Sequence, residues 1–313
     1  MSQRFIVGTR ASELATTQTG MVVALLRMAA PEATFDLVTL KTHGDVIQGA
    51  KELREAGVGV FVKELENALV ENRIDIAVHS AKDLPSLILE GLVLGAIPER
   101  EDVRDLFIGR PGVFLSSLPT HAVIGTASLR RQAFLRAMHP GISLRDLRGN
   151  LDTRLRKLKS RAEGLSGIVV AAAGVNRLGT TLENPGQPLN PEEFVPAPAQ
   201  GALAVEVRAK DLEHMPFLKE IHHTPTAIAI GIERSVLGRM EGGCHVPLGV
   251  WAKVEGDGRV KATACLSSLD GKRMIRATAV GTVNDSEKVA QELEDILRRE
   301  GAADILKTLP RRG

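Results

Sequence analysis

Aromatic side chains are scarce in this chain: phenylalanine, tryptophan and tyrosine make up 3% of its 313 residues, with one tryptophan and no tyrosine. Proteins that bind single-stranded nucleic acid stack the bases on aromatic rings. The composition offers few such platforms and therefore counts against that class of protein.

Cysteine and long apolar runs are also nearly absent. The two cysteines, Cys244 and Cys265, do not make a disulfide framework, and we expect both to be free thiols. No apolar stretch approaches the roughly 18 residues that a membrane-spanning helix needs. The N-terminal stretch MSQRFIVGTRASELA has no apolar signal-peptide core, so we expect a cytoplasmic protein. No cluster of residues has the spacing of zinc ligands, and we expect no metal site.

Net charge is low, but the positive charge is concentrated. The chain carries a formal charge of +2, whereas residues 121–180 hold nine arginines and two lysines against three acidic residues, a local excess of +8. Arginine grips carboxylates and phosphates through two parallel hydrogen bonds. A solvated basic face is the plain alternative for such a run.

Hydrophobic patterning predicts an α/β fold. In the first half, strands at 5–9, 35–42 and 74–80 alternate with helices beginning near Ser12 and spanning 60–73. The alternation repeats at 121–175, where we expect strands at 142–149 and 167–175. Gly-Thr at the end of a strand followed by a helix start occurs in both halves. We therefore predict two similar doubly wound α/β lobes with mostly parallel sheets.

The rest of the chain predicts a return strand and a third domain. A proline-rich segment at 183–201 is followed by a strand at 202–209, which we expect to rejoin the first lobe. Three strand-like runs linked by Asp-Gly turns and a following helix predict a small α+β domain with a three-stranded antiparallel sheet. The predicted domains are 1–99 with 200–217, then 105–193, and then 222–313.

Candidate site residues gather where strands end and helices begin. HSAKDLP (79–85) places Lys82 and Asp83 after a buried strand, where ligands collect in open α/β sheets. An incidental surface pair is the alternative there. A second set of polar residues lies near the ends of strands and the starts of helices, two of them in the first lobe and the rest in the second: Arg10, Ser12, Thr126, Ser128, Arg130, Arg131, Arg148, Arg154 and Arg177. Helix N-termini attract anions, so this set predicts a ligand with several carboxylates or phosphates.

Cys244 lies in the loop EGGCHVP (241–247), between glycines and a proline. It has three interpretations: an inert thiol, a nucleophile, or a point of covalent attachment. Gly242 and Gly243 give the backbone freedom and close access. Cys265 lies in the apolar run ATACLSS, which predicts a core position. No Cys-His-Asn arrangement is apparent, and attachment therefore gains weight for Cys244.

The ordered set of motifs resembles the porphobilinogen deaminase (hydroxymethylbilane synthase) family. The motifs are GTRASELA, THGD, VFVKELE, DIAVHSAKDLP, EREDVRD, GTASLRRQ, LRGNLDTRL, PAPAQGALAVE and EGGCHVPLG, spanning almost the whole chain. The resemblance implies three domains, the first two like type II periplasmic binding proteins. It also implies a transferase that joins four porphobilinogen molecules head to tail, releasing ammonia each time, for tetrapyrrole synthesis.

The resemblance also implies roles for individual residues. It implies a dipyrromethane cofactor attached by a thioether to Cys244, and Asp83 as the catalytic carboxylate that assists proton transfer and stabilises positive charge on pyrrole nitrogen. Cofactor contacts then fall to Lys82, Asp83, Thr126, Ser128, Arg130 and Arg131. Substrate contacts fall to Arg10, Ser12, Arg148, Arg154 and Arg177, with Ser80 assisting. The family also suggests a monomer. From the scarcity of aromatic residues and of long apolar runs we expect no nucleic-acid or membrane partner.

The sequence departs from the family pattern at three positions: His43, Val58 and Ala127. Val58 weakens the expectation that the preceding glycine-containing loop supplies a cation. Two other interpretations stay open, a solute-binding protein for an anionic ligand and a nucleic-acid-binding protein without catalysis. Binding that fell steeply with salt, without ammonia release, would favour the second.

Overall fold

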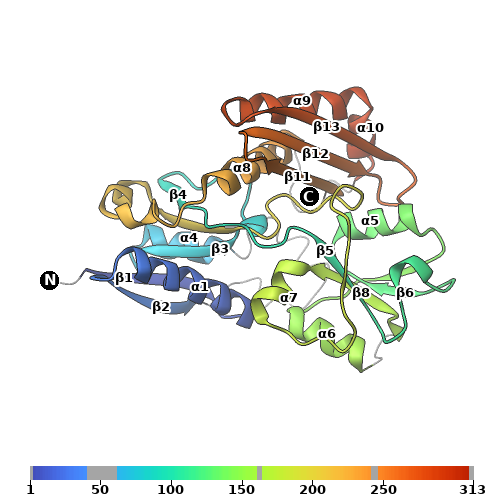
Figure 1. Cartoon of the computed structure of the whole chain (residues 1–313), viewed down its shortest axis with the longest axis horizontal. Coiled ribbons are helices and arrows are strands. Elements are labelled where there is room, and N and C mark those ends of the chain that lie inside the picture. The colour runs from blue at the N-terminus through green and yellow to red at the C-terminus, as the bar shows by residue number, and fades with distance from the viewer. Residues whose placement is uncertain (1–2, 41–61, 161–163, 241–245, 310–313) are drawn as a thin grey trace. The chain divides into compact units, whose positions relative to one another are not determined.

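The computed structural model describes residues 3–40, 62–160, 164–240 and 246–309 (Figure 1). The chain forms two compact units. Unit 1 comprises Met1–Glu101 and Gly201–Ile228, and unit 2 comprises Asp102–Gln200 and Ala229–Gly313. Within the described ranges, no helix is long and apolar enough to cross a membrane.

Unit 1 is built on a five-stranded sheet with the order β2-β1-β3-β10-β4. Its strands are β1 (Arg4–Arg10), β2 (Thr34–Leu40), β3 (Ile76–Ser80), β4 (Leu92–Ala96) and β10 (Leu203–Arg208). β1 pairs in parallel with β2 and β3, whereas β10 runs antiparallel to β3 and β4. The expected return strand at 202–209 is therefore confirmed, and it enters the middle of the sheet.

Two helices cover opposite faces of the unit 1 sheet. α1 (Glu13–Ala29) buries Val22, Val23 and Leu26 against one face, together with a cluster of phenylalanines. α4 (Lys63–Val70) buries Leu65 and Leu69 against the other face. Alternate residues of a strand point to opposite faces, so β3 and β10 each contribute to both layers.

Unit 2 contains a second five-stranded sheet with the order β7-β6-β8-β5-β9. Its strands are β5 (Asp105–Gly109), β6 (Val123–Gly125), β7 (Ser143–Arg145), β8 (Gly167–Ala171) and β9 (Gln187–Pro188). Its helices are α5 (Leu129–Met138), α6 (Leu151–Lys159) and α7 (Ala172–Leu178). β6 is parallel to β7 and β8, and β5 is antiparallel to β8. Its strand order matches that of unit 1 strand for strand, as the repeated sequence pattern predicts.

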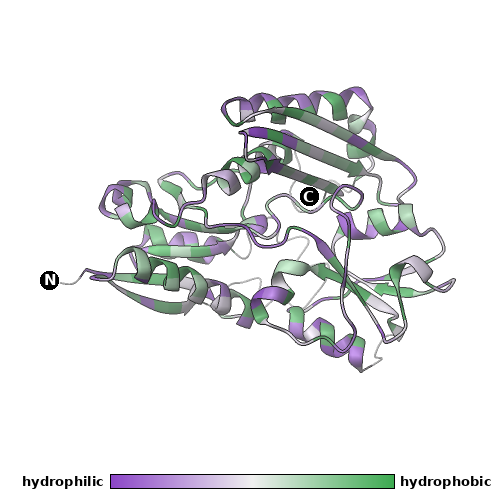
Figure 2. Ribbon diagram, viewed as in Figure 1, coloured by the Kyte–Doolittle hydropathy of each residue, from purple (hydrophilic) through white to green (hydrophobic). Residues whose placement is uncertain are grey.

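The C-terminal part of unit 2 is a three-stranded antiparallel meander with helices. The strands are β11 (Leu248–Val254), β12 (Arg259–Ser267) and β13 (Met274–Thr282). The helices are α8 (Thr224–Arg239), which belongs to unit 2 from Ala229 on, α9 (Ser286–Arg299) and α10 (Ala302–Lys307). Gly258 and Gly271 adopt φ of 81° and 74° in the two turns, a conformation that favours glycine. Figure 2 shows α9 with hydrophilic residues on its outer side, while Val289, Leu293 and Leu297 are buried. The expected α+β region is confirmed.

Short 3-10 turns connect several of these elements. They are η1 (Ala81–Asp83), η2 (Leu115–Ser117), η4 (Ala209–His214), η5 (Pro216–Leu218) and η6 (Val283–Asp285). Packing groups the second and third predicted domains within unit 2, where Cys265 lies in the same core cluster as Phe134 and Phe194. The division into three domains stays a prediction.

Two predicted strands are shorter than expected. The strand predicted at 142–149 covers only Ser143–Arg145, because its partner β6 ends at Gly125, which pairs with Arg145. The next residue, Asp146, accepts a hydrogen bond from Gln132 Nε2 at 2.6 Å. The strand predicted at 167–175 ends at Ala171, where α7 begins. Alanine strongly favours helix, so the run AAAG continues as helix once the β-branched residues end.

Candidate functional site

The predicted catalytic residue follows the central strand of unit 1. The turn η1 (Ala81–Asp83) begins directly after β3, and its first N–H donates to the Ala202 carbonyl at 3.0 Å. Leu84 is buried immediately after the turn, whereas Lys82 and Asp83 are partly exposed. The turn is therefore anchored at both ends, and part of each charged side chain reaches the surface of the unit.

The carboxyl end of β1 lies at the same edge of this sheet, because β1 and β3 are parallel neighbours. Arg10 is the last residue of β1 and is partly exposed. Ser12 caps α1, and its hydroxyl accepts the Ala15 N–H at 3.4 Å. Arg10 and Ser12 thus share this edge with Lys82 and Asp83, as the strand order predicts.

The carboxyl end of β6 forms a comparable turn in unit 2. Thr126 is buried, and its hydroxyl accepts the Ser128 N–H at 3.3 Å. Ser128 caps α5 by accepting the Arg131 N–H at 3.4 Å. Gln132 closes the turn by donating to the Thr126 carbonyl at 2.9 Å and to Asp146. The turn is rigidly held and presents a capped helix N-terminus, where an anion is favoured.

Arg130 lies inside unit 2 rather than on its surface. Its Nη2 lies 2.8 Å from Asp105 Oδ2, and its Nη1 donates to the Val195 carbonyl at 2.8 Å. The guanidinium also stands over the rings of Phe134 and Phe194, 5.8 and 5.5 Å from their centroids. Such stacking on aromatic faces suits the planar guanidinium.

Arg131 reaches the same carboxylate from the next helical position. Its Nη2 lies 2.7 Å from Asp105 Oδ1, and its Nη1 donates to the Val169 carbonyl at 3.2 Å. Its Nη2 also donates to Gln200 Oε1 at 3.3 Å. Neighbouring helix residues point about 100° apart, but both long side chains converge on one acceptor.

Asp105, Arg130 and Arg131 therefore form a buried ionic cluster with a formal charge of +1. Asp105 is fully buried, and the two arginine side chains are 4% and 7% exposed. Burial works to raise the pKa of Asp105, but the two guanidinium groups hold that pKa below its ordinary value. Both arginines have protein partners, and their contact with a cofactor stays a prediction. Asp105 was not among the residues predicted from the sequence, although a lone acidic residue at the start of the apolar run DLFIG is a usable signal.

Three further arginines lie beyond the β7 and β8 ends of the same sheet. Arg148 lies in the turn before α6, next to Gly149, whose φ is 107°. Arg154 is in the first turn of α6 and donates through Nε to the Gly149 carbonyl at 2.8 Å. Arg177 lies in the last turn of α7, so it does not directly follow a strand as expected. All three are partly buried.

The predicted attachment residue, Cys244, lies outside the described residues, as do His43 and Val58. The chain is described up to Met240, which is fully buried, and again from Val246. The Ser267 N–H donates to the Pro247 carbonyl at 3.0 Å. Both flanks of the cysteine-bearing segment are therefore fixed within unit 2.

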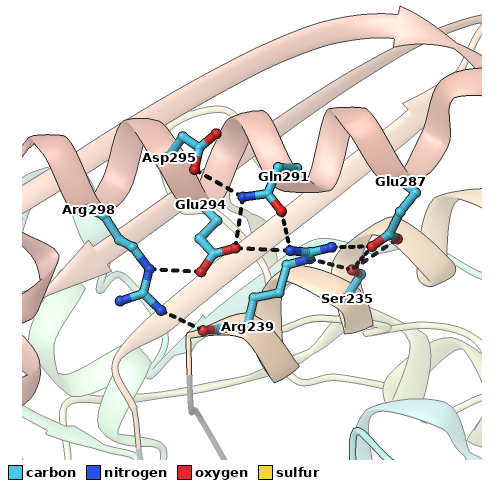
Figure 3. Close-up of polar contacts among 7 residues, drawn as sticks. All are labelled: Ser235, Arg239, Glu287, Gln291, Glu294, Asp295 and Arg298. Atoms are coloured by element: carbon cyan, nitrogen blue, oxygen red, sulfur yellow. Dashed lines mark hydrogen bonds and ion pairs between the residues drawn. The ribbon is translucent and has the colours of Figure 1, made fainter.

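A network of polar side chains fixes the end of α8 against α9 (Figure 3). Arg239 lies between Glu287, Gln291 and Glu294, and its Nη1 is 3.1 Å from Glu294 Oε2. Arg298 donates through Nε to Glu294 at 2.7 Å and through Nη2 to the Arg239 carbonyl at 2.9 Å. Cations near a helix C-terminus also stabilise its dipole.

Comparison with known proteins identifies the family. A model of the porphobilinogen deaminase dipyrromethane cofactor binding domain matches residues 5–215, and a model of the porphobilinogen deaminase C-terminal domain matches residues 227–298. Porphobilinogen deaminase of Brevibacillus brevis is 44% identical over 96% of this chain and 96% of its own length. The Bacillus subtilis enzyme is 40% identical over 99% of this chain and 98% of its own length.

Similarity to solved structures is weaker. The periplasmic aliphatic sulphonate binding protein SsuA from Escherichia coli aligns with a TM-score of 0.42 and 12% identity, over 100% of this chain and 94% of that chain. The assignment therefore rests on the sequence relatives, which cover nearly the full chain. The chain belongs to the porphobilinogen deaminase family.

Proposed function

We propose that this chain joins four porphobilinogen molecules into hydroxymethylbilane and that Asp83 is its catalytic carboxylate. The family match over nearly the whole chain supports the reaction. The observation that supports the residue is the partly exposed Asp83 on an anchored turn after the central strand of unit 1. This is the strand end at which open α/β sheets bind their ligands.

The chemistry asks for a fixed anion beside the reacting pyrrole. Each addition breaks the carbon–nitrogen bond of the incoming aminomethyl group, and its electron pair leaves with ammonia. The new carbon–carbon bond takes its pair from the acceptor pyrrole, whose α-carbon then loses a proton. A carboxylate at Asp83 stabilises positive charge on the pyrrole nitrogen and exchanges a proton with the leaving amine and the α-carbon.

The donor set of unit 2 fits a carboxylate-rich cofactor. Dipyrromethane carries acetate and propionate groups, and burying these anions requires fixed cations and hydrogen-bond donors. The +1 cluster of Asp105, Arg130 and Arg131 and the capped start of α5 at Ser128 are of that chemistry. When bound, the group supplies the free pyrrole position to which the first substrate is joined.

We assign the remaining contacts as follows. Cys244 carries the cofactor as a thioether, and Lys82, Asp83, Thr126, Ser128, Arg130 and Arg131 bind it. Arg10, Ser12, Arg148, Arg154 and Arg177 bind substrate carboxylates. The protein works as a cytoplasmic monomer, without nucleic-acid or membrane partners, and equilibrium sedimentation of the holoenzyme tests the monomer.

Substitution of Asp83 tests the proposal. Asp83→Asn is expected to lower kcat about 100-fold or more, the usual contribution of a positioned acid or base, and Asp83→Glu should retain more activity than Asn. Ammonia release and product absorbance are the measurements. Glu90→Gln, an exposed change in the same unit, serves as the matched control. Near wild-type turnover in Asp83→Asn would remove Asp83 from the mechanism.

A further inference from the structure

Three ionisable side chains, carried by β3, β10 and α4, lie inside unit 1. His79 on β3 and Glu206 on β10 are 5% and 0% exposed, and His79 Nε2 lies 2.9 Å from Glu206 Oε2. Glu66 of α4 is 9% exposed and close enough for Glu206 to affect its ionisation. We name His79, Glu206 and Glu66 the buried triad.

The triad interrupts an apolar interface. In the register of β3 and β10, His79 is opposite Ala204 and Glu206 is opposite Ala77, so His79 and Glu206 are diagonal neighbours on one face. Ala77 belongs to the apolar cluster formed with α4. Apolar side chains of similar size at these positions would often be neutral or stabilising. The polar triad therefore is not explained by packing alone.

The triad also favours retention of a proton inside the fold. Two ionised carboxylates with a neutral imidazole would place a charge of −2 in the core. Burial, and then the charge of Glu206, raises the pKa of Glu66, while His79 acts to lower it. Glu66 Oε1 and Glu206 Oε1 are buried and have no hydrogen-bond partner among the described residues. An added proton relieves this excess of negative charge.

The triad is linked to the Asp83 turn directly along β3 and through the pairing of β3 with β10. His79 lies on β3, four residues before Asp83 of the turn that follows this strand, and β10 pairs with β3 as far as Leu203 opposite Ser80. One residue earlier, the Ala202 carbonyl accepts the hydrogen bond that holds the turn. A change in the position of the triad side chains can therefore move the Asp83 turn through β3 and β10. A change in the charge of the triad acts on Asp83 through its electric field.

The elements around the triad carry other charged groups, which either form ion pairs or lie at the ends of their elements. Arg208, on the same face of β10, is held by Asp75 at 2.9 Å and by Asp211. α4 also carries Lys63 and Glu64, and β1 ends in Arg10. Arg208 is two residues from Glu206 and is the nearest of these cations along the sequence. None of these groups is changed in Glu206→Gln or His79→Gln.

We propose that the buried triad positions the Lys82–Asp83 turn and sets the charge that Asp83 experiences during the reaction. This inference rests on the proposed catalytic function of Asp83. His79, Glu206 and Glu66 are positioning residues, because they act through the turn and have no assigned contact with substrate.

Two single variants give the sharpest test, because they differ by a full charge. In Glu206→Gln, His79 lies beside an uncharged amide. In His79→Gln, the Glu206 carboxylate loses its imidazole partner and keeps its negative charge. A unit charge about 10 to 13 Å away shifts a pKa by about half to one unit at an effective dielectric near 20 with salt screening. The acid limb of kcat/KM should therefore lie about half to one pH unit lower in Glu206→Gln than in His79→Gln.

The steady-state constants give a second readout. Both variants should lower kcat about tenfold or more, with KM changed less than about threefold. The matched control is the exposed pair of the same unit, His214→Gln and Glu213→Gln, whose atoms lie 3.6 Å apart. If both triad variants lose only thermal stability and keep the wild-type pH profile, the triad is structural and the proposal is wrong.

A reciprocal measurement needs no activity and no change in the core. The ring signals of His79, assigned by their loss in His79→Gln, are compared by NMR in wild type and in Asp83→Asn. Removing the Asp83 charge should move the chemical shifts of these signals, because the coupling of two sites is mutual. Unchanged chemical shifts overturn the inference. Retained turnover in Asp83→Asn would instead overturn the catalytic assignment, so the two failures are distinguishable.

Discussion

The ionic cluster around Asp105 offers a direct test of how unit 2 is held together. Asp105 is fully buried and neutralises part of the charge of Arg130 and Arg131, whose side chains are 4% and 7% exposed. Asp105→Asn keeps the shape of the side chain but leaves two buried guanidinium groups without an anion. Removing one partner of a buried ion pair costs about 3 to 5 kcal/mol.

The expected loss is large enough to measure without ambiguity. A unit of this size loses about 2 to 4 °C in Tm for each kcal/mol, so the variant should melt about 6 to 20 °C lower. Trp251 is the only tryptophan of the chain, and it packs against the cluster that contains Phe134 and Cys265. Its fluorescence during guanidinium chloride unfolding therefore reports on unit 2.

The same variant has a defined pH dependence. Because the folded-state pKa of Asp105 is depressed below its ordinary value of 3.8, the stabilisation is present above that value and is lost as pH falls through the depressed pKa. The difference between wild type and Asp105→Asn should thus stay constant from pH 8 to 5 and shrink below about pH 4.

The control is Asp304→Asn, also in unit 2, where the side chain is 65% exposed and 3.4 Å from Arg273. It should change stability by less than about 1 kcal/mol. If Asp105→Asn also costs less than about 1 kcal/mol, the reasoning that this carboxylate compensates two buried cations is refuted.

Three other results are expected. Burial raises the pKa of Cys265 to about 11, so at pH 8 about one Cys265 thiol in a thousand is ionised. In a folded Cys244→Ser variant, Ellman's reagent should therefore react only after denaturation. Rapid labelling would contradict the core position of Cys265. Arg239→Ala removes the side-chain contacts of Arg239 with Glu287, Gln291 and Glu294 and should cost about 1 to 2 kcal/mol in urea unfolding. No loss would mean that these contacts are dispensable. The folded-state pKa of Glu66 is raised, so the stability of the wild-type protein falls as pH rises through that pKa. Glu66→Gln should therefore be more stable than wild type at pH 8 but not at pH 4. An equal effect at both pH values would contradict the raised pKa.

Much of the fold was predictable where the signal is local. The Ser12 and Ser128 caps and the Asp-Gly turns before β12 and β13 were read from short sequence patterns, and the structure confirms each element that follows them. Such features depend on a few adjacent residues, and their backbone geometry is set by side-chain chemistry that sequence displays directly.

Partners distant in sequence were not predictable. Neighbouring positions of a helix point about 100° apart, yet Arg130 and Arg131 both bind Asp105. Asp105 is 25 residues earlier than Arg130, on an antiparallel strand that was not predicted from the sequence. The pairing of His79 with Glu206 joins residues 127 positions apart. Only the order of strands in the sheet brings such residues together.

Between these extremes lie the boundaries of β8 and α7. The run GIVVAAAGV has no charge or proline to mark where strand becomes helix, and the structure makes the change after Ala171. Arg177 moves with that boundary, from a strand end to the last turn of a helix. An error of a few residues thus changes the predicted direction of a functional side chain.

The most direct measurement is the intact mass of the purified holoenzyme beside a Cys244→Ser variant. If Cys244 carries the cofactor, the wild-type protein should have extra mass equal to two linked pyrrole units, and the variant should lack it. Apoprotein incubated with porphobilinogen should regain this mass only in the wild type. Bare polypeptide mass after that incubation, or the same added mass on the variant, would contradict attachment through Cys244.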